Sequence, residues 1–574
     1  MGTARSAAGG RPAGRRWRRA VGGMSLVVAA GLAVGGCGSS SPAGPACPAG
    51  PAAASGASVG GGAATPAAAG QAGGPVKRAV AATWSRPGGN LQNTRDVASA
   101  ITSSNVSQLG VAWTVPLRIT SHTDGAYATT PVVVDGVVYL QDLDSNVMAI
   151  SLASGKVLWR HDYNSPNGGP DGVNVANGVV YAATNHAAVA LSAATGSQLW
   201  SRTLIGNSHE GIDMAPGYNH GTVYVSTVPV NPTVGVYLGG GKATLWALNA
   251  VTGAPEWSWD EVQDLWGKPG INSGGGQWYP PSFDAQGNLY IGVANPGPLG
   301  GARGYPWGTS RPGPDLYTDS VVKLSPQGKL LWYYQLTPHD LFDWDLQNPP
   351  VLTTAHGQPV VIDGGKAGIL IELNAQTGKL RWKLPVGVHN GHDNDGLLTE
   401  YAKPTSHLRL PTEVCIEPGL IGGIETQLAS NGSTTFAAVN DLPLPMNATG
   451  RSTGSAAATI QAVFKATGEM VAVNQDTGKI EWDTKLPSSP YGAATVTNNV
   501  VFTTTFHGDL YALSAATGAI LLKTPLSAGS NAAVAIDGDY VIAGAGAPLS
   551  AGQHPLIIAY RLGATGRLPD TVGS

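Results

Sequence analysis

The stretch AISLASGKVLW, residues Ala149–Trp159, decides the fold because the chain repeats it. Each copy places small and hydrophobic residues before a turn glycine, and most copies end on a tryptophan after three further residues. The copies lie at Ala149–Trp159, Ala190–Trp200, Ala247–Trp257, Lys323–Trp332, Glu372–Trp382, Ala472–Trp482 and Ala512–Leu522. The pattern predicts a strand, a tight turn in which glycine permits positive φ, and a second strand. We expect each tryptophan to dock between neighbouring units.

The spacing of the copies indicates the architecture. The first two turn glycines, Gly155 and Gly196, are 41 residues apart, and the last two, Gly478 and Gly518, are 40 apart. About 40 residues is the length of one four-stranded propeller blade. Seven copies therefore predict seven blades, and the longer steps between copies carry insertions. The tail strands Ala532–Gly546 and Leu556–Leu562 predict an eighth blade, which the early strand Gly110–Leu117 is expected to close.

The composition agrees with an all-β, eight-bladed β-propeller, which we expect to span residues 79–566, followed by a short tail at 567–574. Charged residues make up 12% of the chain, and 80 of its 574 residues are glycine, as is typical of a protein with many turns. The net charge is -3, and no basic patch lies in the body of the chain. The charge therefore argues against nucleic acid as a partner.

The amino terminus predicts export. Six arginines between residues 5 and 19 precede the apolar run Val21–Ala33, which is too short to span a bilayer comfortably. The following Val34–Cys37 resembles the bacterial lipobox. Residues 1–37 are therefore expected to be a lipoprotein signal peptide, with Cys37 lipidated on the outer face of the cell membrane and no other membrane contact. An ordinary secretory signal that contains a cysteine stays an alternative, as does either export route, Sec or Tat.

Residues 38–78 are rich in Ala, Gly, Ser and Pro and are expected to form a disordered tether. Cys47 lies in this tether, and Cys415 is the one cysteine of the predicted body. No disulfide is therefore expected within the body.

One loop carries an unusual density of acids. Within Arg311–Leu352, His339, Asp340, Asp343 and Asp345 lie among Phe342 and Trp344. Such a loop between strands is a candidate for base chemistry or for holding a hard cation. The alternative is a turn whose acids accept hydrogen bonds from backbone amides.

The repeats and three further stretches resemble the pyrroloquinoline quinone (PQQ)-dependent alcohol dehydrogenases. The stretches Trp84–Leu117, Trp278–Pro298 and Gly364–Trp382 follow in that family's order and spacing. The resemblance implies an exported quinoprotein that oxidises the hydroxyl of a small alcohol or a sugar with PQQ and a bound metal ion. The chain has no C-x-x-C-H haem motif, so electrons are expected to pass to a separate acceptor.

The resemblance also implies roles for single residues. Asp343 matches the catalytic aspartate, which is the base for the substrate hydroxyl and lies at the metal. Trp278 matches the tryptophan that stacks on the quinone, and Lys366 the basic residue at the quinone carbonyls. Asn295 matches a metal ligand. Asp345 resembles the extra acid of the lanthanide-dependent branch, so that the metal is Ca²⁺ or a lanthanide ion; the alternative is that Asp345 only caps a turn.

The chain departs from the family elsewhere. It has no adjacent cysteine pair; Ala128 stands where the family has a glutamate in the first blade; and Tyr224–Trp246, where a metal-binding glutamate is usual, contains no acid. Glu425 occupies a position where asparagine is frequent, and Tyr491 replaces the tryptophan on the opposite quinone face; both are expected to contact the cofactor. A non-catalytic propeller lipoprotein that serves as a scaffold or ligand-binding module is the alternative function, and such a protein has no need of Lys366 or the acidic loop.

Overall fold

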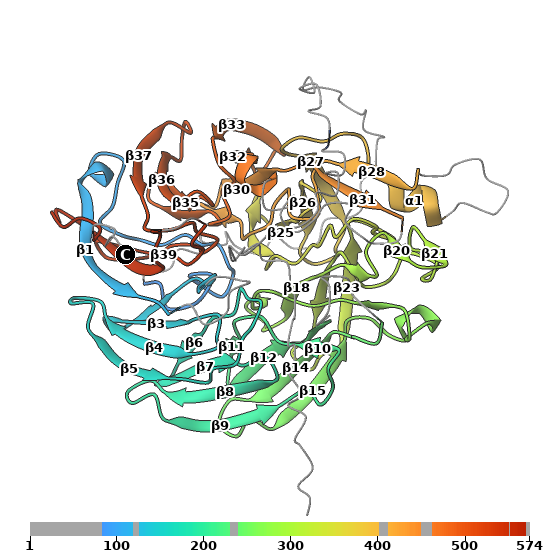
Figure 1. Ribbon diagram of the computed structural model, residues 1–574, viewed down its shortest axis with the longest axis horizontal. Helices are drawn as coiled ribbons and strands as arrows, with labels where there is room; N and C mark the ends of the chain where they lie inside the picture. The colour runs from blue at the N-terminus through green and yellow to red at the C-terminus, as the bar shows by residue number, and fades with distance from the viewer. Residues whose placement is uncertain are drawn as a thin grey trace, which may run out of the picture.

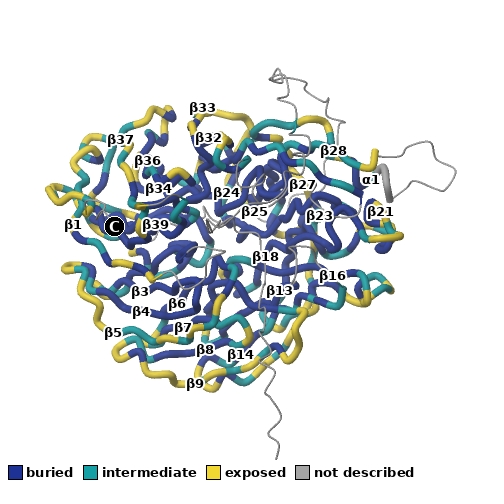
Figure 2. Tube along the Cα trace, in the orientation of Figure 1, coloured by how far each residue is buried: buried dark blue, intermediate teal, exposed yellow. Residues whose placement is uncertain are grey.

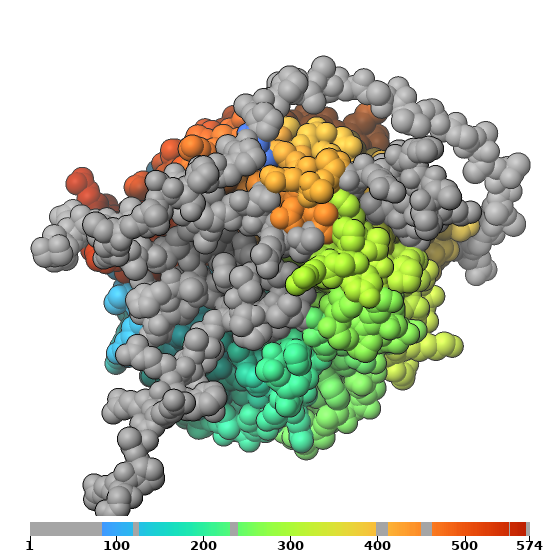
Figure 3. Space-filling view, turned by 45° about the vertical axis from the view of Figure 1, so that its right-hand side comes forward, coloured from blue at the N-terminus to red at the C-terminus, as the bar shows by residue number. Residues whose placement is uncertain are grey.

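The computed structural model describes residues 47, 83–118, 126–229, 239–400, 411–448, 462–549 and 552–569. It contains eight four-stranded antiparallel sheets that radiate from one axis (Figure 1). Successive sheets lie side by side in chain order round the ring (Figures 1 and 3). The predicted eight-bladed β-propeller is confirmed.

Each blade runs from its innermost to its outermost strand. Blade one consists of β2 (Val132–Val134), β3 (Val137–Gln141), β4 (Val147–Ser151) and β5 (Val157–His161), and blade two of β6 (Asn174–Ala176), β7 (Val179–Ala183), β8 (Ala187–Ser192) and β9 (Gln198–Thr203). Blade three consists of β11 (Gly217–Asn219), β12 (Thr222–Ser226), β14 (Thr244–Asn249) and β15 (Pro255–Asp260), and blade four of β17 (Ser282–Phe283), β18 (Leu289–Val293), β22 (Ser320–Leu324) and β23 (Leu330–Gln335).

Blade five consists of β24 (Val351–Ala355), β25 (Gln358–Gly364), β26 (Ile369–Asn374) and β27 (Leu380–Pro385), and blade six of β29 (Ala429–Ser430), β30 (Thr434–Asp441), β32 (Thr467–Asn474) and β33 (Lys479–Leu486). Blade seven consists of β34 (Thr495–Thr497), β35 (Val500–Thr504), β36 (Asp509–Ser514) and β37 (Ile520–Pro525), and blade eight of β38 (Ala535–Asp537), β39 (Tyr540–Ala545), β40 (Leu556–Leu562) and β1 (Leu109–Pro116).

Short elements fill the connections. The two-stranded pairs are β10 (Glu210–Gly211) with β13 (Val228–Pro229), β16 (Ser273–Gly274) with β19 (Pro296–Gly297), β20 (Gly301–Ala302) with β21 (Tyr305–Pro306), and β28 (Glu413–Ile416) with β31 (Leu444–Asn447). The short helices of the described ranges include η1 (Val106–Gln108), η2 (Leu265–Gly267) and α1 (Asp395–Glu400). Within the described ranges, no helix is long and apolar enough to cross a membrane.

Burial follows the distance from the axis. The inner strands are buried on both faces and the outermost strands alternate, as β26 and β27 of one blade illustrate (Figure 2). A strand packed between two neighbouring blades needs apolar residues on both faces, whereas an edge strand needs them on one. The hydrophobic core is therefore a series of layers between blades.

The ring closes as the sequence predicts. β1 pairs with β40 in an antiparallel register that runs from Leu109 opposite Leu562 to Pro116 opposite Leu556. The last blade thus combines the first described strand of the chain with the three strands nearest its carboxyl end. This exchange joins the two ends of the propeller by a ladder of backbone hydrogen bonds.

The repeated tryptophans join neighbouring blades. The ring of Trp332 in blade four lies against Gly378 in the turn of blade five, and its indole Nε1 donates to the carbonyl of Ala375, 3.2 Å away. The pairs are Trp113–Gly155, Trp159–Gly196, Trp200–Gly253, Trp257–Gly328, Trp332–Gly378, Trp382–Gly478 and Trp482–Gly518. Between blades seven and eight, Leu522 packs against the core in place of a tryptophan. The expected docking of tryptophan between units is confirmed.

Replacing Gly378 by alanine is expected to lower the free energy of unfolding by about 2 kcal/mol or more. Gly378 has a φ of +68°, and a Cβ there would lie 2.7 Å from the Trp332 ring. Gly357→Ala is the matched control, because Gly357 has a φ of +71° with nothing within 4 Å of the added Cβ. The control carries only the backbone strain, about 1 kcal/mol. Equal losses in urea unfolding would contradict a role for the tryptophan contact.

The segment before β1 ties the inner ends of the blades together. Its backbone bonds to the inner region of one blade after another: Trp84 to Val133, Leu91 to Phe283, Gln92 to Leu352, Thr94 to Ser430, Arg95 to Val496 and Ala100 to Gly538. The fully buried Arg95 lies at the centre of this path. Its guanidinium donates to Gln427, Thr495 and the carbonyl of Ala494, and lies 5.0 Å from the centre of the Trp84 ring. The segment thus links at least six blades.

A disulfide joins the segment before the propeller to the propeller itself. The sequence predicted no disulfide within the body and did not identify a bond between the body and the tether, yet Cys47 is bonded to Cys415 of β28. The two cysteines are 368 residues apart, so only the folded structure brings them together. The remainder of the predicted signal peptide and tether, Cys37 included, lies outside the described residues.

Candidate active site at the propeller axis

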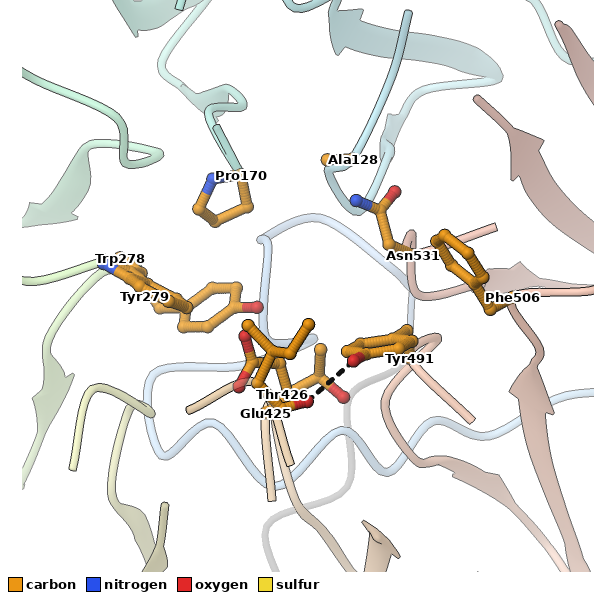
Figure 4. A pocket seen from close by; sticks show the side chains of 10 residues that line it. Ala128, Pro170, Trp278, Tyr279, Glu425, Thr426, Tyr491, Phe506 and Asn531 are labelled. Carbon is orange, nitrogen blue, oxygen red and sulfur yellow. Dashed lines mark hydrogen bonds between the residues drawn. The ribbon is translucent and has the colours of Figure 1, made fainter. Parts of the chain in front are cut away.

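A cavity that is partly open to solvent lies at the axis. Trp278 and Tyr279 line one side of it, and Tyr491, Phe506 and Asn531 line the opposite side (Figure 4). The remaining lining residues are Ala128, Pro170, Ile421, Glu425 and Thr426. Six of the eight blades contribute to this wall.

Position in the repeat explains why these residues meet. Trp278 and Tyr279 precede β17, Glu425 and Thr426 precede β29, and Asn531 precedes β38. The segment that enters the innermost strand of each blade is the part of the blade closest to the axis. Residues more than 100 positions apart in the sequence therefore face one another across a single cavity.

Lys366 lies beside this cavity and connects the residues predicted for the chemistry. Its Nζ lies 2.9 Å from Asp343 Oδ2, also forms an ion pair with Asp345 Oδ2, and lies 4.6 Å from the centre of the Trp278 ring. Lys366, Asp343 and Asp345 are all nearly fully buried. The two aspartates therefore face one cation, as their spacing allows, and that cation is the ammonium of Lys366.

The conformation of the acidic loop directs Asp343 and Asp345 to Lys366. Asp340 accepts hydrogen bonds from the backbone N–H of Phe342 and Trp344, both at 2.9 Å, so this acid does cap the turn. Asp343 has a φ of +67°, a left-handed conformation that is uncommon outside glycine. The turn held by Asp340 thus presents Asp343 away from its own backbone.

Asn295 follows β18 and adjoins the same group. Its backbone N–H donates to Asp345 Oδ1 at 2.7 Å, and its side-chain Nδ2 donates to the carbonyl of Pro296 at 3.0 Å. Because the amide nitrogen is engaged in this way, the amide oxygen is left as the group that can bind a cation. Asn295, Asp343 and Asp345 together provide the hard oxygen donors that Ca²⁺ and similar ions prefer.

Burial changes the protonation of these acids. It raises the pKa of Asp343 well above its ordinary value, and the charge of Lys366 opposes that shift. Burial likewise raises the pKa of Glu425 to about 7, again opposed by Lys366. Asp343 is thus a better proton acceptor than an exposed aspartate.

Two buried acids at the site escaped the sequence analysis. Asp213, in the segment before β11, has its pKa raised by burial and then by the charge of Asp345, which shows that the two carboxyls are near each other. Glu261, after β15, accepts hydrogen bonds from Ser226, Gln277 and the backbone N–H of Gly276, and so supports the residues next to Trp278. The position of Asp213 just before an inner strand was the one clue in the sequence.

A hard cation fits the site. Asp343 Oδ1 has no hydrogen-bond partner among the described residues, although it is buried, and Asp213 Oδ1 is in the same state. No group of three or more His, Cys, Asp or Glu side chains is assembled as a metal centre within the described ranges. Asp343, Asp345 and Asn295 would therefore hold the ion together with oxygens from a cofactor or water.

The quinone fits the site on one side. Trp278 offers an aromatic face and Lys366 a cation at its edge, which suits a planar, electron-poor anion. The lining of the cavity carries no positive residue, and Glu425 is its one acid. The half of the site around Trp278 and Lys366 therefore matches a quinone, while the opposite wall offers its carboxylates no positive residue.

Replacing Glu425 by glutamine is expected to stabilise the protein above about pH 7 and to have no effect near pH 4. The folded pKa of about 7 exceeds the ordinary 4.5, so the folded state binds more protons than the unfolded state between these values, and stability falls as the pH rises through that window. The gain at pH 8 is about 3 kcal/mol at most. Thermal unfolding at both pH values tests it; an equal gain at pH 4 would contradict this cause.

The loop His389–Asp395 contains two His–Asp pairs. His389 Nδ1 lies 3.0 Å from Asp393 Oδ1, and His392 Nδ1 lies 2.7 Å from Asp395 Oδ2. Each histidine has a carboxylate partner of its own, and the side chains do not converge on a common point.

Two family profiles match the chain. The profile described as "Glucose/ethanol/alcohol dehydrogenase, beta-propeller domain" matches residues 84–181 and 235–405, which include Trp278, Asn295, Asp343 and Lys366. The profile described as "Outer membrane protein assembly factor BamB" matches residues 143–271 and 466–554. The first of these profiles covers the acidic loop and the Lys366 turn, whereas the second covers neither.

The chain is also similar to individual dehydrogenases, to the first below in sequence and to the other two in fold. The chain is 28% identical to the quinohemoprotein alcohol dehydrogenase of Comamonas testosteroni over 502 residues, which cover 75% of this chain and 67% of that protein. The structure resembles that of quinohemoprotein alcohol dehydrogenase ADHIIG from Pseudomonas putida, with a TM-score of 0.71, 21% identity, and coverage of 85% and 81%. It also resembles a europium-containing methanol dehydrogenase, with a TM-score of 0.68, 19% identity, and coverage of 84% and 98%. The chain therefore contains a PQQ-type β-propeller domain and is similar to the quinohemoprotein alcohol dehydrogenases.

Proposed function

We propose that this protein is an exported dehydrogenase that oxidises the hydroxyl of a small alcohol or a sugar with PQQ and a Ca²⁺ or lanthanide ion. One observation carries the proposal: the Lys366 ammonium lies 2.9 Å from Asp343 Oδ2 and 4.6 Å from the centre of the Trp278 ring, beside the axial cavity. A lysine, an aspartate and an aromatic face so arranged beside a cavity suit a bound quinone, whereas a scaffold has no need of them. The relatives, which are quinohemoprotein alcohol dehydrogenases, support the same class of reaction.

Each residue has a part in this chemistry. When bound, PQQ accepts the two electrons of the oxidation, and the metal ion makes its carbonyl more electrophilic. Asp343 takes the proton of the substrate hydroxyl on Oδ1, the oxygen that has no other partner among the described residues. Lys366 holds Oδ2 of the same carboxylate and so fixes the direction of Oδ1. Trp278 provides the flat surface on which the quinone stacks.

The surroundings of the reaction follow from the sequence. We propose that residues 1–37 direct export and that Cys37 carries a lipid which anchors the protein to the outer face of the bacterial membrane. The Cys47–Cys415 disulfide supports an oxidising location. A separate electron acceptor reoxidises the cofactor, since the chain contains no C-x-x-C-H motif.

The test is reconstitution of the purified chain. PQQ is added with Ca²⁺ or with La³⁺, binding is followed by quinone absorbance, and activity is followed by dye-linked oxidation of a panel of alcohols and sugars. We expect binding that requires one of the ions and activity towards at least one class of substrate. If the quinone binds with neither ion, the proposal is wrong, and the non-catalytic propeller becomes the better account.

Asp345→Ala is expected to weaken the binding of La³⁺ by about tenfold or more, and that of Ca²⁺ less, because a trivalent ion gains more from each added carboxylate. Asp345 faces the same cation position as Asp343, so its loss removes one charge from the site. Competition of the two ions for the quinone-loaded protein measures the change. The control is Asp162→Ala, an exposed carboxylate of the rim. If the preference for La³⁺ over Ca²⁺ is unchanged, Asp345 acts only in the turn and does not bind the metal ion.

A further inference from the structure

The turn that carries Lys366 is fastened to the surrounding structure at each end. The Gly368 N–H donates to the Gly365 carbonyl at 2.9 Å, which closes the turn, and the Lys366 N–H donates to the Asp345 carbonyl at 3.0 Å. The carbonyl of Gly368, at the far end of the turn, accepts from the Val386 N–H at 2.8 Å and faces His389 Nε2 at 3.2 Å. His389 therefore contacts the turn two residues from Lys366.

Both ring nitrogens of His389 face acceptors. Nδ1 lies 3.0 Å from Asp393 Oδ1, while Nε2 lies 3.2 Å from the Gly368 carbonyl and 3.1 Å from the Val386 carbonyl. A neutral imidazole has one N–H and can satisfy only one of these sides. The imidazolium donates on both sides, so the geometry suits the charged form of His389.

The charged groups around His389 favour its imidazolium form. Three carboxyls face it: Asp393 in its own loop, Glu417 in the segment after β28, and Asp441 at the end of β30. The nearby cations are Lys485, which acts on Asp441, and Lys383, which acts on Asp393. Burial alone would lower the pKa of His389, but Asp393 and the carbonyls of Val386 and Gly368 outweigh it and raise the pKa above the ordinary value.

The backbone beside His389 is held by blade six. The Gly387 N–H donates to Glu469 at 2.9 Å, and the Val388 N–H donates to Asp441 at 3.2 Å. The ring of His389 thus extends from a fixed strand end towards the Lys366 turn. Gly368 leaves room for it, because a Cβ at that position would lie 3.1 Å from His389 Nε2.

We propose that His389 is a positioning residue whose imidazolium clamps the Gly365–Gly368 turn and thereby holds Lys366 against Asp343 and Asp345. When the ring loses its proton, its one remaining N–H donates either to Asp393 or to the carbonyls that face Nε2. The tautomer that donates to Asp393 no longer holds the Gly368 carbonyl, and the turn loosens. The folded pKa of His389 is raised above its unfolded value, so the clamp is complete below the unfolded pKa and is lost as the pH rises through the folded pKa. The effect on the position of Lys366 is independent of the proposed function; only the effect on turnover rests on it.

Hydrogen exchange of the peptide spanning residues 364–370 tests the clamp without cofactor or substrate. We expect His389→Gln to exchange about tenfold faster than the natural chain at about pH 6, since a charged hydrogen bond is lost, and the two rates to converge by about pH 9. Comparison at equal pH removes the intrinsic pH dependence of exchange. His392→Gln is the matched control, because His392 lies in the same loop and pairs with its own aspartate. For this variant, the ratio of its exchange rate to that of the natural chain should be near one.

The second variant changes the pKa and keeps the ring. Asp393→Asn removes the carboxylate that stabilises the imidazolium, so the pH at which the turn loosens should move downwards. A ratio near one for His389→Gln at about pH 6, or a ratio that does not change with pH, would overturn the proposal. If the reconstituted protein is active, kcat should fall along the same pH midpoint as the exchange protection. Protection that titrates in a protein without activity would leave the clamp intact and contradict the proposed function alone.

Discussion

Asp343→Asn is expected to lower kcat about a thousandfold while the propeller stays folded. The substitution removes the group that accepts the substrate proton, at a position where burial has raised the pKa of the carboxyl. Lys366 keeps its ion pair with Asp345, so no buried charge is left alone. Quinone binding and turnover are measured separately on the reconstituted variant.

Two results would argue against Asp343 as the base. A variant that keeps more than about a tenth of the wild-type kcat would show that another group takes the proton. A variant that fails to bind the quinone would show that Asp343 acts chiefly through the metal. Asp363→Asn is the control: it changes a buried aspartate of the same blade that accepts a hydrogen bond from Gly364.

Lys366→Met is expected to lower the free energy of unfolding by about 3–5 kcal/mol at neutral pH. The ammonium is the charge partner of two buried carboxylates, Asp343 and Asp345, and its removal leaves both uncompensated. The loss should shrink in acid, where Asp343, whose pKa burial raises, is protonated. Urea unfolding followed by tryptophan fluorescence and circular dichroism measures it.

A variant in which both carboxylates are replaced by amides tests whether unpaired carboxylates cause the loss of stability. In the double variant Asp343→Asn/Asp345→Asn, the same Lys366→Met change should cost much less, because the carboxylates that needed the ammonium are absent. Lys383→Met is the matched control, since Lys383 lies on the exposed strand β27. A loss that is equal in both backgrounds would attribute the effect of Lys366 to packing on Trp278.

The fold could be predicted because each repeat contains both the residues that form one blade and a residue that contacts the next blade. Trp332 and Gly378 illustrate this: the turn glycine is necessary for the local backbone, and the tryptophan is necessary for the contact with the next blade. A pattern that specifies both the unit and its neighbour specifies a ring once it is repeated often enough. The number of strands left over at the two ends then fixed the closing blade.

The site could be predicted only where the resemblance covered it. Asp343 and Lys366 are 23 residues apart and lie on successive elements of one blade and its entrance, so their meeting follows from the local fold. Asp213 reaches Asp345 from another blade, and Cys47 reaches Cys415 across 368 residues. Such contacts depend on how the whole ring closes, and no short stretch of sequence contains that information.

The closing blade has a consequence for synthesis. β1 emerges from the ribosome early, but its partner β40 ends at Leu562, close to the end of the chain. The ring therefore cannot close before the other seven blades and β40 have been synthesised. Until then the first strand has an unpaired edge, which leaves it open to pairing with another strand.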